Sequence, residues 1–181
     1  METAKAHERR KKEGWYKDHV NTDRPGLDIG CGDDPLNAVF RRWDKQHGDG
    51  DAVKLTGIPN DCFWTVYASH VLEHLHDPLA AVKEWLRVLH PSGKLIICVP
   101  DIDLYEGKAD LPSRWNGDHK TFWRLEYPLP NDGNHVKGLK ETIEQAHGKI
   151  LHLTTLKYGH EYPDKLIHPR GEYSLEVIAA K

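Results

Sequence analysis

The sequence contains no long hydrophobic run. Its longest unbroken aliphatic stretch is Leu95 to Val99, whereas a helix that crosses a membrane needs roughly 20 apolar residues. The charged N-terminus is also not followed by an apolar stretch. The sequence therefore predicts neither a membrane span nor a signal peptide.

Cysteines and excess basic charge are also scarce. The three cysteines, Cys31, Cys62 and Cys98, lie far apart and form no C-x-x-C pair. This spacing argues against a disulfide framework and a thiolate zinc site, and it predicts a reducing compartment, which we take to be the cytoplasm. The formal net charge is −3, and the only basic cluster is Arg9 to Lys12. Nucleic acid is therefore not the expected partner.

The domain organisation follows from length and composition. A chain of 181 residues is expected to form one domain. Residues 1–24 are polar and are interpreted as a separate N-terminal segment, or as a lid, because Trp15 and Tyr16 need a surface to cover. We expect a single domain over residues 25–181. Residues 100–134, rich in Pro, Gly and Asp, are too long for a plain connector and are interpreted as an insertion in that domain.

Short apolar runs between turn residues predict the secondary structure. Helices are expected from Pro78 to Leu89, after an Asp77 N-cap, and from Val136 to Ala146. The predicted strands cover 25–30, 37–43, 51–55, 63–69, 94–99, 150–157 and 173–180. Strands that alternate with helices favour an open, mostly parallel α/β sheet. In such sheets the ligand binds beyond the carboxyl ends of the strands.

A glycine bend follows the first predicted strand, in the sequence Asp28-Ile29-Gly30-Cys31-Gly32. The dinucleotide fingerprint needs a third glycine three residues after Gly32, but Pro35 stands there. The bend contains several acidic residues, and no Lys or Arg occurs from 26 to 40. A pyrophosphate would meet like charge in this bend, whereas an ammonium or sulfonium group would be attracted.

Two more acidic residues occur at the right places for a nucleoside. Asp44 ends the second predicted strand, where an acid commonly holds ribose hydroxyls. Asp51 begins the third predicted strand and could accept a hydrogen bond from an exocyclic amine such as that of adenine. Each acid alone is more often a turn residue, and it is their order along the chain that favours a nucleoside site.

Five segments together resemble the class I S-adenosylmethionine-dependent methyltransferases: LDIGCG, Asp44, GDA at 50–52, VYASHVLEHLHDP and RVLHPSGKLIICVPD. The resemblance implies a Rossmann-like, seven-stranded, mostly parallel sheet with helices on both faces, and S-adenosyl-L-methionine as cofactor. The cofactor contacts that it implies are Asp28, Gly30, Cys31, Gly32, Asp44, Asp51, Ala52, Ser69 and His70. Asp44 comes only twelve positions after Gly32, so the first helix of the family is expected to be reduced to a turn.

The segment His70-Val71-Leu72-Glu73-His74 also matches H-x-x-E-H, the pattern of inverted zinc proteases. A zinc hydrolase would need His70 and His74 on one face of a helix, with Glu73 as base. The segment directly follows a strand, and Asp77-Pro78 restarts the chain, so about one helical turn is available. We therefore keep the zinc hydrolase as a remote alternative and expect no metal site.

Methyl transfer to oxygen or nitrogen benefits from a general base that takes the proton of the acceptor. His119, in the insertion, is the first candidate, and His70 and Asp101 are its rivals. The acceptor is expected to be a small molecule, because the chain has no basic stripe and no Asn-Pro-Pro-Tyr motif. The alternative is an inactive partner subunit that binds the cofactor without turnover.

Overall fold

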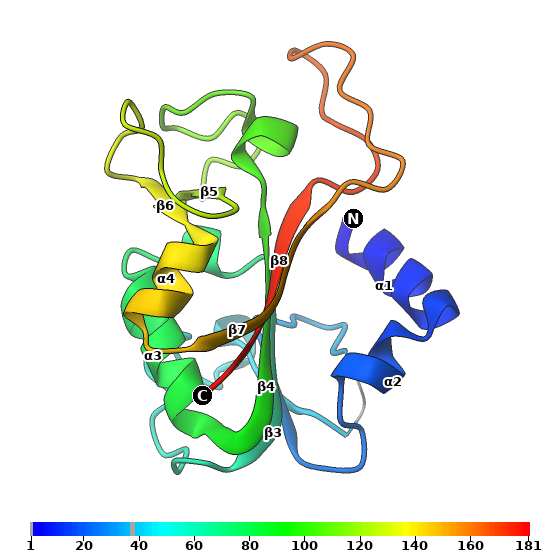
Figure 1. The fold of residues 1–181 in the computed structure, drawn as a ribbon, viewed down its shortest axis with the longest axis vertical. Coiled ribbons are helices and arrows are strands. Elements are labelled where there is room, and N and C mark those ends of the chain that lie inside the picture. The colour runs from blue at the N-terminus through cyan, green and yellow to red at the C-terminus, as the bar shows by residue number, and fades with distance from the viewer. Residues whose placement is uncertain (1, 37–38) are drawn as a thin grey trace.

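The computed structural model describes residues 2–36 and 39–181, and it shows a central sheet with helices on both faces (Figure 1). The helices are α1 (Glu2–Glu13), α2 (Trp15–His19), α3 (Pro78–Val88) and α4 (Leu139–Gln145). The strands are β1 (Gly26–Ile29), β2 (Arg41–Trp43), β3 (Phe63–Ser69), β4 (Leu89–Pro100), β5 (Phe122–Arg124), β6 (Val136–Gly138), β7 (Lys149–Leu156) and β8 (Ser174–Ala180). Short turns of helix are η1 (Lys45–His47), η2 (Leu72–His74) and η3 (Ile102–Glu106).

Within the described residues, the central sheet has six strands in the order β2-β1-β3-β4-β8-β7. Neighbouring strands from β2 to β4 pair in parallel, and β8 runs antiparallel to both β4 and β7. The predicted open, mostly parallel α/β architecture is confirmed. The strand count of seven is wrong, because the expected third strand is absent.

Side chains explain why residues 51–55 form turns and not a strand. The indole of Trp43 donates to the carbonyl of Asp51, and the indole of Trp85 donates to the carbonyl of Ala52. The backbone N–H of Leu55 donates to Glu84. Backbone groups that are already bonded to side chains are not available for a strand ladder. The segment is thus fixed in space without belonging to the sheet.

The connection from β1 to β2 contains no helix over residues 30–36 and 39–40, as the short spacing predicts. The predicted second strand begins at 37, but residues 37 and 38 lie outside the described part, and β2 begins at Arg41. Phe40 packs onto the start of β1 so closely that a Cβ on Gly26 would lie 2.3 Å from its ring. Glycine at this position allows the short connection.

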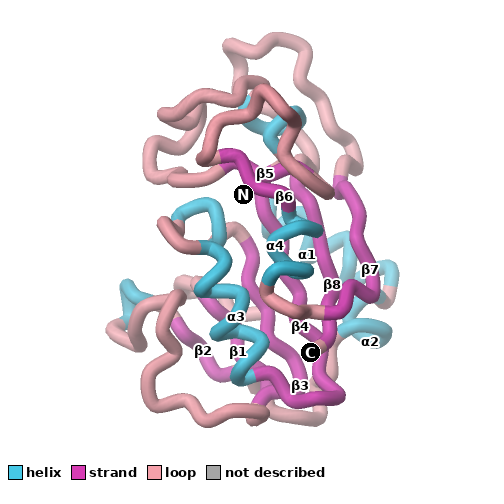
Figure 2. The backbone as a smooth tube through the Cα atoms, turned by 60° about the vertical axis from the view of Figure 1, so that its left-hand side comes forward, coloured by secondary structure: helices cyan, strands magenta, loops and turns pink. Residues whose placement is uncertain are grey.

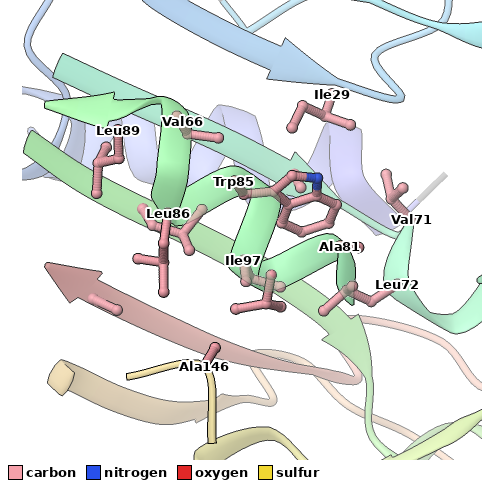
Figure 3. Packing of buried hydrophobic residues seen from close by; sticks show 14 of the residues in the cluster. Ile29, Val66, Val71, Leu72, Ala81, Trp85, Leu86, Leu89, Ile97 and Ala146 are labelled. Atoms are coloured by element: carbon pink, nitrogen blue, oxygen red, sulfur yellow. The ribbon is translucent and has the colours of Figure 1, made fainter. Parts of the chain in front are cut away.

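Helices α3 and α4 cover one face of the sheet, and Figure 2 shows both in front of the strands. Asp77 accepts a hydrogen bond from the backbone N–H of Ala80, so the predicted cap of α3 is confirmed. In the core of this face, Trp85 of α3 packs among aliphatic side chains such as Ile29 and Ile97 (Figure 3). Burial of such large apolar side chains stabilises the fold by about 25 cal/mol per Å².

The N-terminal residues form a helix that packs on the other face of the sheet (Figure 1). Arg10 of α1 is 2% exposed and forms an ion pair with Glu176 of β8. It also donates to the hydroxyl of Tyr67 and the sulfur of Cys98, both at 3.4 Å. A buried, paired arginine fixes α1 against the sheet.

The segment 100–134 carries η3 and β5, and β5 pairs with β6 in a separate two-stranded sheet. Strand β6 occupies the start of the helix predicted from Val136, so α4 begins three residues later, at Leu139. The backbone N–H groups of Lys120 and Thr121 both donate to the carbonyl of Glu73. The segment is therefore fastened to the loop after β3. In the described part of the chain, no helix is long and apolar enough to cross a membrane.

Candidate functional site

The carboxyl ends of β1, β2 and β3 open onto a cavity with two connected parts, which share Gly30, Asp44, Gln46 and His70. The glycine part, of about 440 Å³, is lined by residues that include Asp28, Cys31, Gly32, Tyr67 and Ser69. The histidine part, of about 870 Å³, is lined by residues that include Asp51, Ala52, His74, Asp118 and Lys120. Ligand pockets commonly have volumes of about 300–1,000 Å³. The site lies where parallel α/β sheets bind their ligands.

The glycine bend depends on backbone conformations that favour glycine. Gly30 has φ +69° and Gly32 has φ +54°. The backbone N–H of Gly30 donates to the carbonyl of Trp43, which ties the bend to the end of β2. A Cβ at Gly30 would clash with Val71, whereas a Cβ at Gly32 would meet no atom within 4 Å. The chain at Gly32 is thus open to the close approach of a ligand.

Asp28 lies buried at the base of the bend, with only 2% of its surface exposed. Its carboxylate accepts a hydrogen bond of 2.6 Å from the backbone N–H of Leu36. Burial raises the pKa of Asp28 to about 7, with further contributions from the nearby charges of Asp34 and Asp44. A positively charged ligand group would favour the ionised form of this carboxyl.

Asp44 holds the bend and the following turn together. Its carboxylate accepts hydrogen bonds from the backbone N–H groups of Gly32, at 2.9 Å, and Gln46, at 2.8 Å. The side chain is 8% exposed and lines both parts of the cavity. Each carboxylate oxygen can accept more than one hydrogen bond. Asp44 can therefore keep the loop in place and still accept hydrogen bonds from ligand hydroxyls.

The remaining residues of the predicted cofactor site also lie around the cavity. Asp51 and Ala52 line the histidine part. They lie on the loop whose carbonyls accept hydrogen bonds from the indoles of Trp43 and Trp85. Cys31 and Ser69 line the glycine part. Burial raises the pKa of Cys31 to about 11, so its thiol is neutral at neutral pH. The fold thus brings all nine predicted cofactor residues to one cavity.

The three predicted bases differ in position. His70 lies at the end of β3 and lines both parts of the cavity. His119 is buried, lines neither part, and bonds through Nδ1 to Glu106 Oε1 at 3.1 Å. Asp101 caps η3 by accepting from the N–H groups of 103 and 104. Burial raises the pKa of Asp101 despite these hydrogen bonds.

Contacts around His70 and His119 include Glu106 and Ser174, which sequence reasoning did not select, and Glu73, which it considered only as the base of a zinc hydrolase. Glu73, 1% exposed, places Oε1 3.3 Å from Nδ1 of His70, and Ser174 Oγ lies 3.2 Å from Nε2. Burial alone would raise the pKa of Glu106, but hydrogen bonds from His119, Ser113 and Arg114 lower it overall. Glu106 and Ser174 lie outside any recognisable motif, so only the fold could bring them here. Glu73 belongs to the HVLEHL segment, and this motif is the sequence signal that could have identified it as a site residue.

The H-x-x-E-H interpretation does not fit the structure. Of the five residues, only Leu72, Glu73 and His74 form a turn of 3₁₀-helix, and His70 has φ +58°. His70 and His74 therefore do not share a helical face as the inverted zinc-protease pattern requires. The zinc hydrolase alternative has no structural support.

The cavity fits a cationic nucleoside better than a pyrophosphate. At the glycine bend, the open space beside Gly32 would take a ligand in van der Waals contact with the backbone. The acids that surround this space are Asp28, Asp33, Asp34 and Asp44, and no lysine or arginine lines the glycine part among the described residues. Carboxylates can pair with an ammonium group and accept hydrogen bonds from hydroxyls.

Comparisons with known proteins relate part of the chain to methyltransferases. A family model described as a methyltransferase domain matches residues 36–97, which begin just after the glycine bend and include Asp44 and the HVLEHL segment. No curated protein matches the sequence.

Solved structures of low sequence identity share the fold. An S-adenosylmethionine-dependent methyltransferase from Aquifex aeolicus has a TM-score of 0.54 at 13% identity, with 93% of this chain and 87% of that chain covered. One from Mesorhizobium loti has a TM-score of 0.52 at 14% identity, with 87% and 91% covered. A chain of the complex that contains the Haloferax volcanii Trm112 methyltransferase activator has a TM-score of 0.53 at 11% identity, with 97% and 92% covered.

Proposed function

We propose that this chain is a class I S-adenosylmethionine-dependent methyltransferase, because it has the fold of such enzymes and a methyltransferase-domain segment at 36–97. The proposed reaction moves a methyl group to an oxygen or nitrogen atom of a small molecule in the cytoplasm. The observation that supports it most is one cavity that gathers the acidic glycine bend, Asp44 and His70.

We assign the cofactor's amino-acid end to the bend formed by Asp28, Gly30, Cys31 and Gly32. Asp44 would accept hydrogen bonds from the ribose hydroxyls. Asp51 and Ala52 would lie beside the adenine, and Ser69 and His70 would form the wall near the sulfur. When bound, the cofactor supplies an activated methyl group, so the residues mainly need to hold and orient two reactants.

We assign the role of general base to His70, because it alone of the three candidates lines both parts of the cavity. Glu73 lies at ion-pair distance from Nδ1 of His70. A carboxylate in this position stabilises the protonated ring. His119 and Asp101 stay predictions with less geometric support.

Calorimetric titration with S-adenosylmethionine and its demethylated product tests the cofactor assignment. Replacing Asp44 by Ala or Asn should lower the affinity for both ligands by a factor of about 10 to 100, because charge-assisted hydrogen bonds are lost. Asp61→Ala, at the opposite end of the sheet beside Lys181, is the matched control and should bind normally. Equal affinity of wild type and both Asp44 variants would remove Asp44 from the ribose role.

A second candidate function is an inactive subunit that binds the cofactor and assists a partner. The similarity to a chain in the complex of the Haloferax volcanii Trm112 activator favours this alternative, because protein partnership occurs with that fold. Product formation in an acceptor screen separates the two functions. Wild type should methylate at least one small acceptor, and His70→Ala should lower kcat by about 10²–10⁴-fold. Cofactor binding without any product would favour the partner subunit.

A further inference from the structure

A cluster of three side chains that can bind a metal ion lies next to the cavity. The proposed methyl transfer does not use this cluster as a metal site. Glu73, His74 and His119 each offer one ligand atom, and these atoms lie within 4.8 Å of one another. The first two come from η2, and His119 comes from the segment 100–134. The rings of the two histidines are 5.0 Å apart and nearly perpendicular.

Glu73 is the strongest indication that the cluster binds a cation. It is 1% exposed, and among the described residues neither carboxylate oxygen has a hydrogen-bond partner. Within the described part of the chain, the basic group at ion-pair distance from it is the ring of His70, which is charged only when protonated and is itself 21% exposed. A buried carboxylate without hydrogen bonds is costly unless a cation compensates its charge.

Both histidines are oriented as metal ligands commonly are. His119 bonds through Nδ1 to Glu106, and Ser113 and the backbone N–H of Arg114 hold that glutamate in turn. His74 bonds through Nδ1 to Asp118 at 3.2 Å. In both rings Nε2 is then the nitrogen left for a metal, and a carboxylate on the far nitrogen is the usual support of a ligating histidine.

We propose that Glu73, His74 and His119 bind one divalent transition-metal ion of the zinc type. Two imidazoles and one carboxylate suit zinc, cobalt or iron(II) better than magnesium or calcium, which prefer oxygen ligands. This site uses different residues from the H-x-x-E-H pattern and does not depend on methyl transfer. The bound ion would join η2 to the segment 100–134, beside the two backbone hydrogen bonds to the carbonyl of Glu73.

Three protein ligands leave at least one coordination position open. His74 lines the histidine part of the cavity, whereas Glu73 and His119 are buried behind it. The open position would therefore be close to the cavity, where an oxygen or nitrogen atom of a small molecule can reach it.

Titration of the untagged, chelator-treated full chain with Co²⁺ tests the site through its visible absorption and through elemental analysis. Wild type should bind one equivalent, and Glu73→Gln, His74→Ala and His119→Ala should each weaken binding at least about tenfold. His76→Ala is the matched control, since this exposed histidine lies two residues from His74 and outside the cluster. It should bind Co²⁺ as wild type does.

Thermal unfolding separates loss of metal from loss of fold. Glu73→Gln removes a buried charge, so the metal-free variant should melt no lower than metal-free wild type, while Co²⁺ should raise the melting temperature of wild type only. His74 is half-exposed, so its truncation provides a second folded variant. If wild type and His74→Ala bind Co²⁺ equally, or if wild type takes up no stoichiometric metal, the proposal is wrong.

Discussion

The two faces of the central sheet are covered by different chemistry. On the α3 and α4 face, Leu95, Ile97 and Val99 of β4 pack into a large apolar cluster. On the α1 and α2 face, the alternate residue Ile96 belongs to a small cluster, and Cys98 borders the buried pair of Arg10 and Glu176. One face is held by burial of apolar surface and the other largely by charge.

This difference determines how the contribution of each face to the stability of the fold depends on pH. Apolar packing changes little with pH, whereas buried carboxyls titrate with perturbed pKa values. Burial raises the pKa of both Glu176 and Asp28 on the α1 and α2 face. On α3, by contrast, Arg87 lowers the pKa of the more exposed Glu84. The two faces should therefore respond to pH in opposite directions.

Trp85→Ala should have the largest effect on stability. It removes a fully buried indole from the apolar face and also the hydrogen bond to Ala52, so we expect a loss of about 3–5 kcal/mol in the free energy of unfolding. Urea denaturation measures it. Trp64→Ala, at a half-buried indole stacked on His90, is the control and should lose less. Equal losses would contradict the assignment of the main core to the α3 face.

Arg10→Met tests the charged face. The variant leaves Glu176 buried without its partner and should lower the free energy of unfolding by about 3–5 kcal/mol. The double variant Arg10→Met/Glu176→Leu should recover most of this loss, because no buried charge remains. Denaturation of both variants checks it. A double variant as unstable as the single one would show that the helix position, and not charge pairing, carries the effect.

The pH dependence of stability should have opposite signs on the two faces. The pKa of Asp28 is raised to about 7 in the folded protein, so its contribution is fully present below its unfolded pKa of about 4 and is lost as pH rises through about 7. The pKa of Glu84 is lowered, so its contribution is lost as pH falls.

Denaturation from about pH 2 to about pH 8, a range that includes both the raised pKa of Asp28 and the lowered pKa of Glu84, measures both effects. Relative to wild type, Asp28→Asn should gain stability as pH rises, and Glu84→Gln should gain it as pH falls. Parallel pH profiles for the two variants would remove the contrast between the faces.

Asp77→Ala should have the smallest effect. The side chain caps α3 through the N–H of Ala80, and its loss should lower the free energy of unfolding by about 1 kcal/mol. Asp77→Asn, which keeps an acceptor oxygen, should recover most of it. A loss as large as that of Trp85→Ala would mean that α3 depends on its cap more than on its packing.

Local signals predicted the elements whose hydrogen bonds and burial are local. Strand β3 covers the predicted range 63–69, and α3 begins at Pro78 after its Asp77 cap. The predictions failed where contacts with other elements decide the backbone conformation. Residues 51–55 have the pattern of a strand, but distant indoles take up their carbonyls. Residues Val136 to Gly138, at the start of the predicted second helix, form strand β6 because β5 pairs with them.

The nine predicted cofactor residues lie at one cavity because their motifs follow the ends of strands in the chain, and these strand ends meet at one edge of the sheet. The contacts of His119 could not be predicted in this way. Its partner Glu106 lies in a π-helical turn, and its neighbour Glu73 lies after β3, so their approach depends on how the segment 100–134 folds back.

The sequence by itself determined the alternation of strands and helices, the acidic glycine bend and the order of acids that suits a cationic nucleoside, since these depend on residues close together in the chain. Only the tertiary structure decided the pairing of Arg10 with Glu176, the absence of the third strand and the cluster of Glu73 with two histidines. Each of these arises between segments far apart in sequence, where packing and desolvation outweigh local preference.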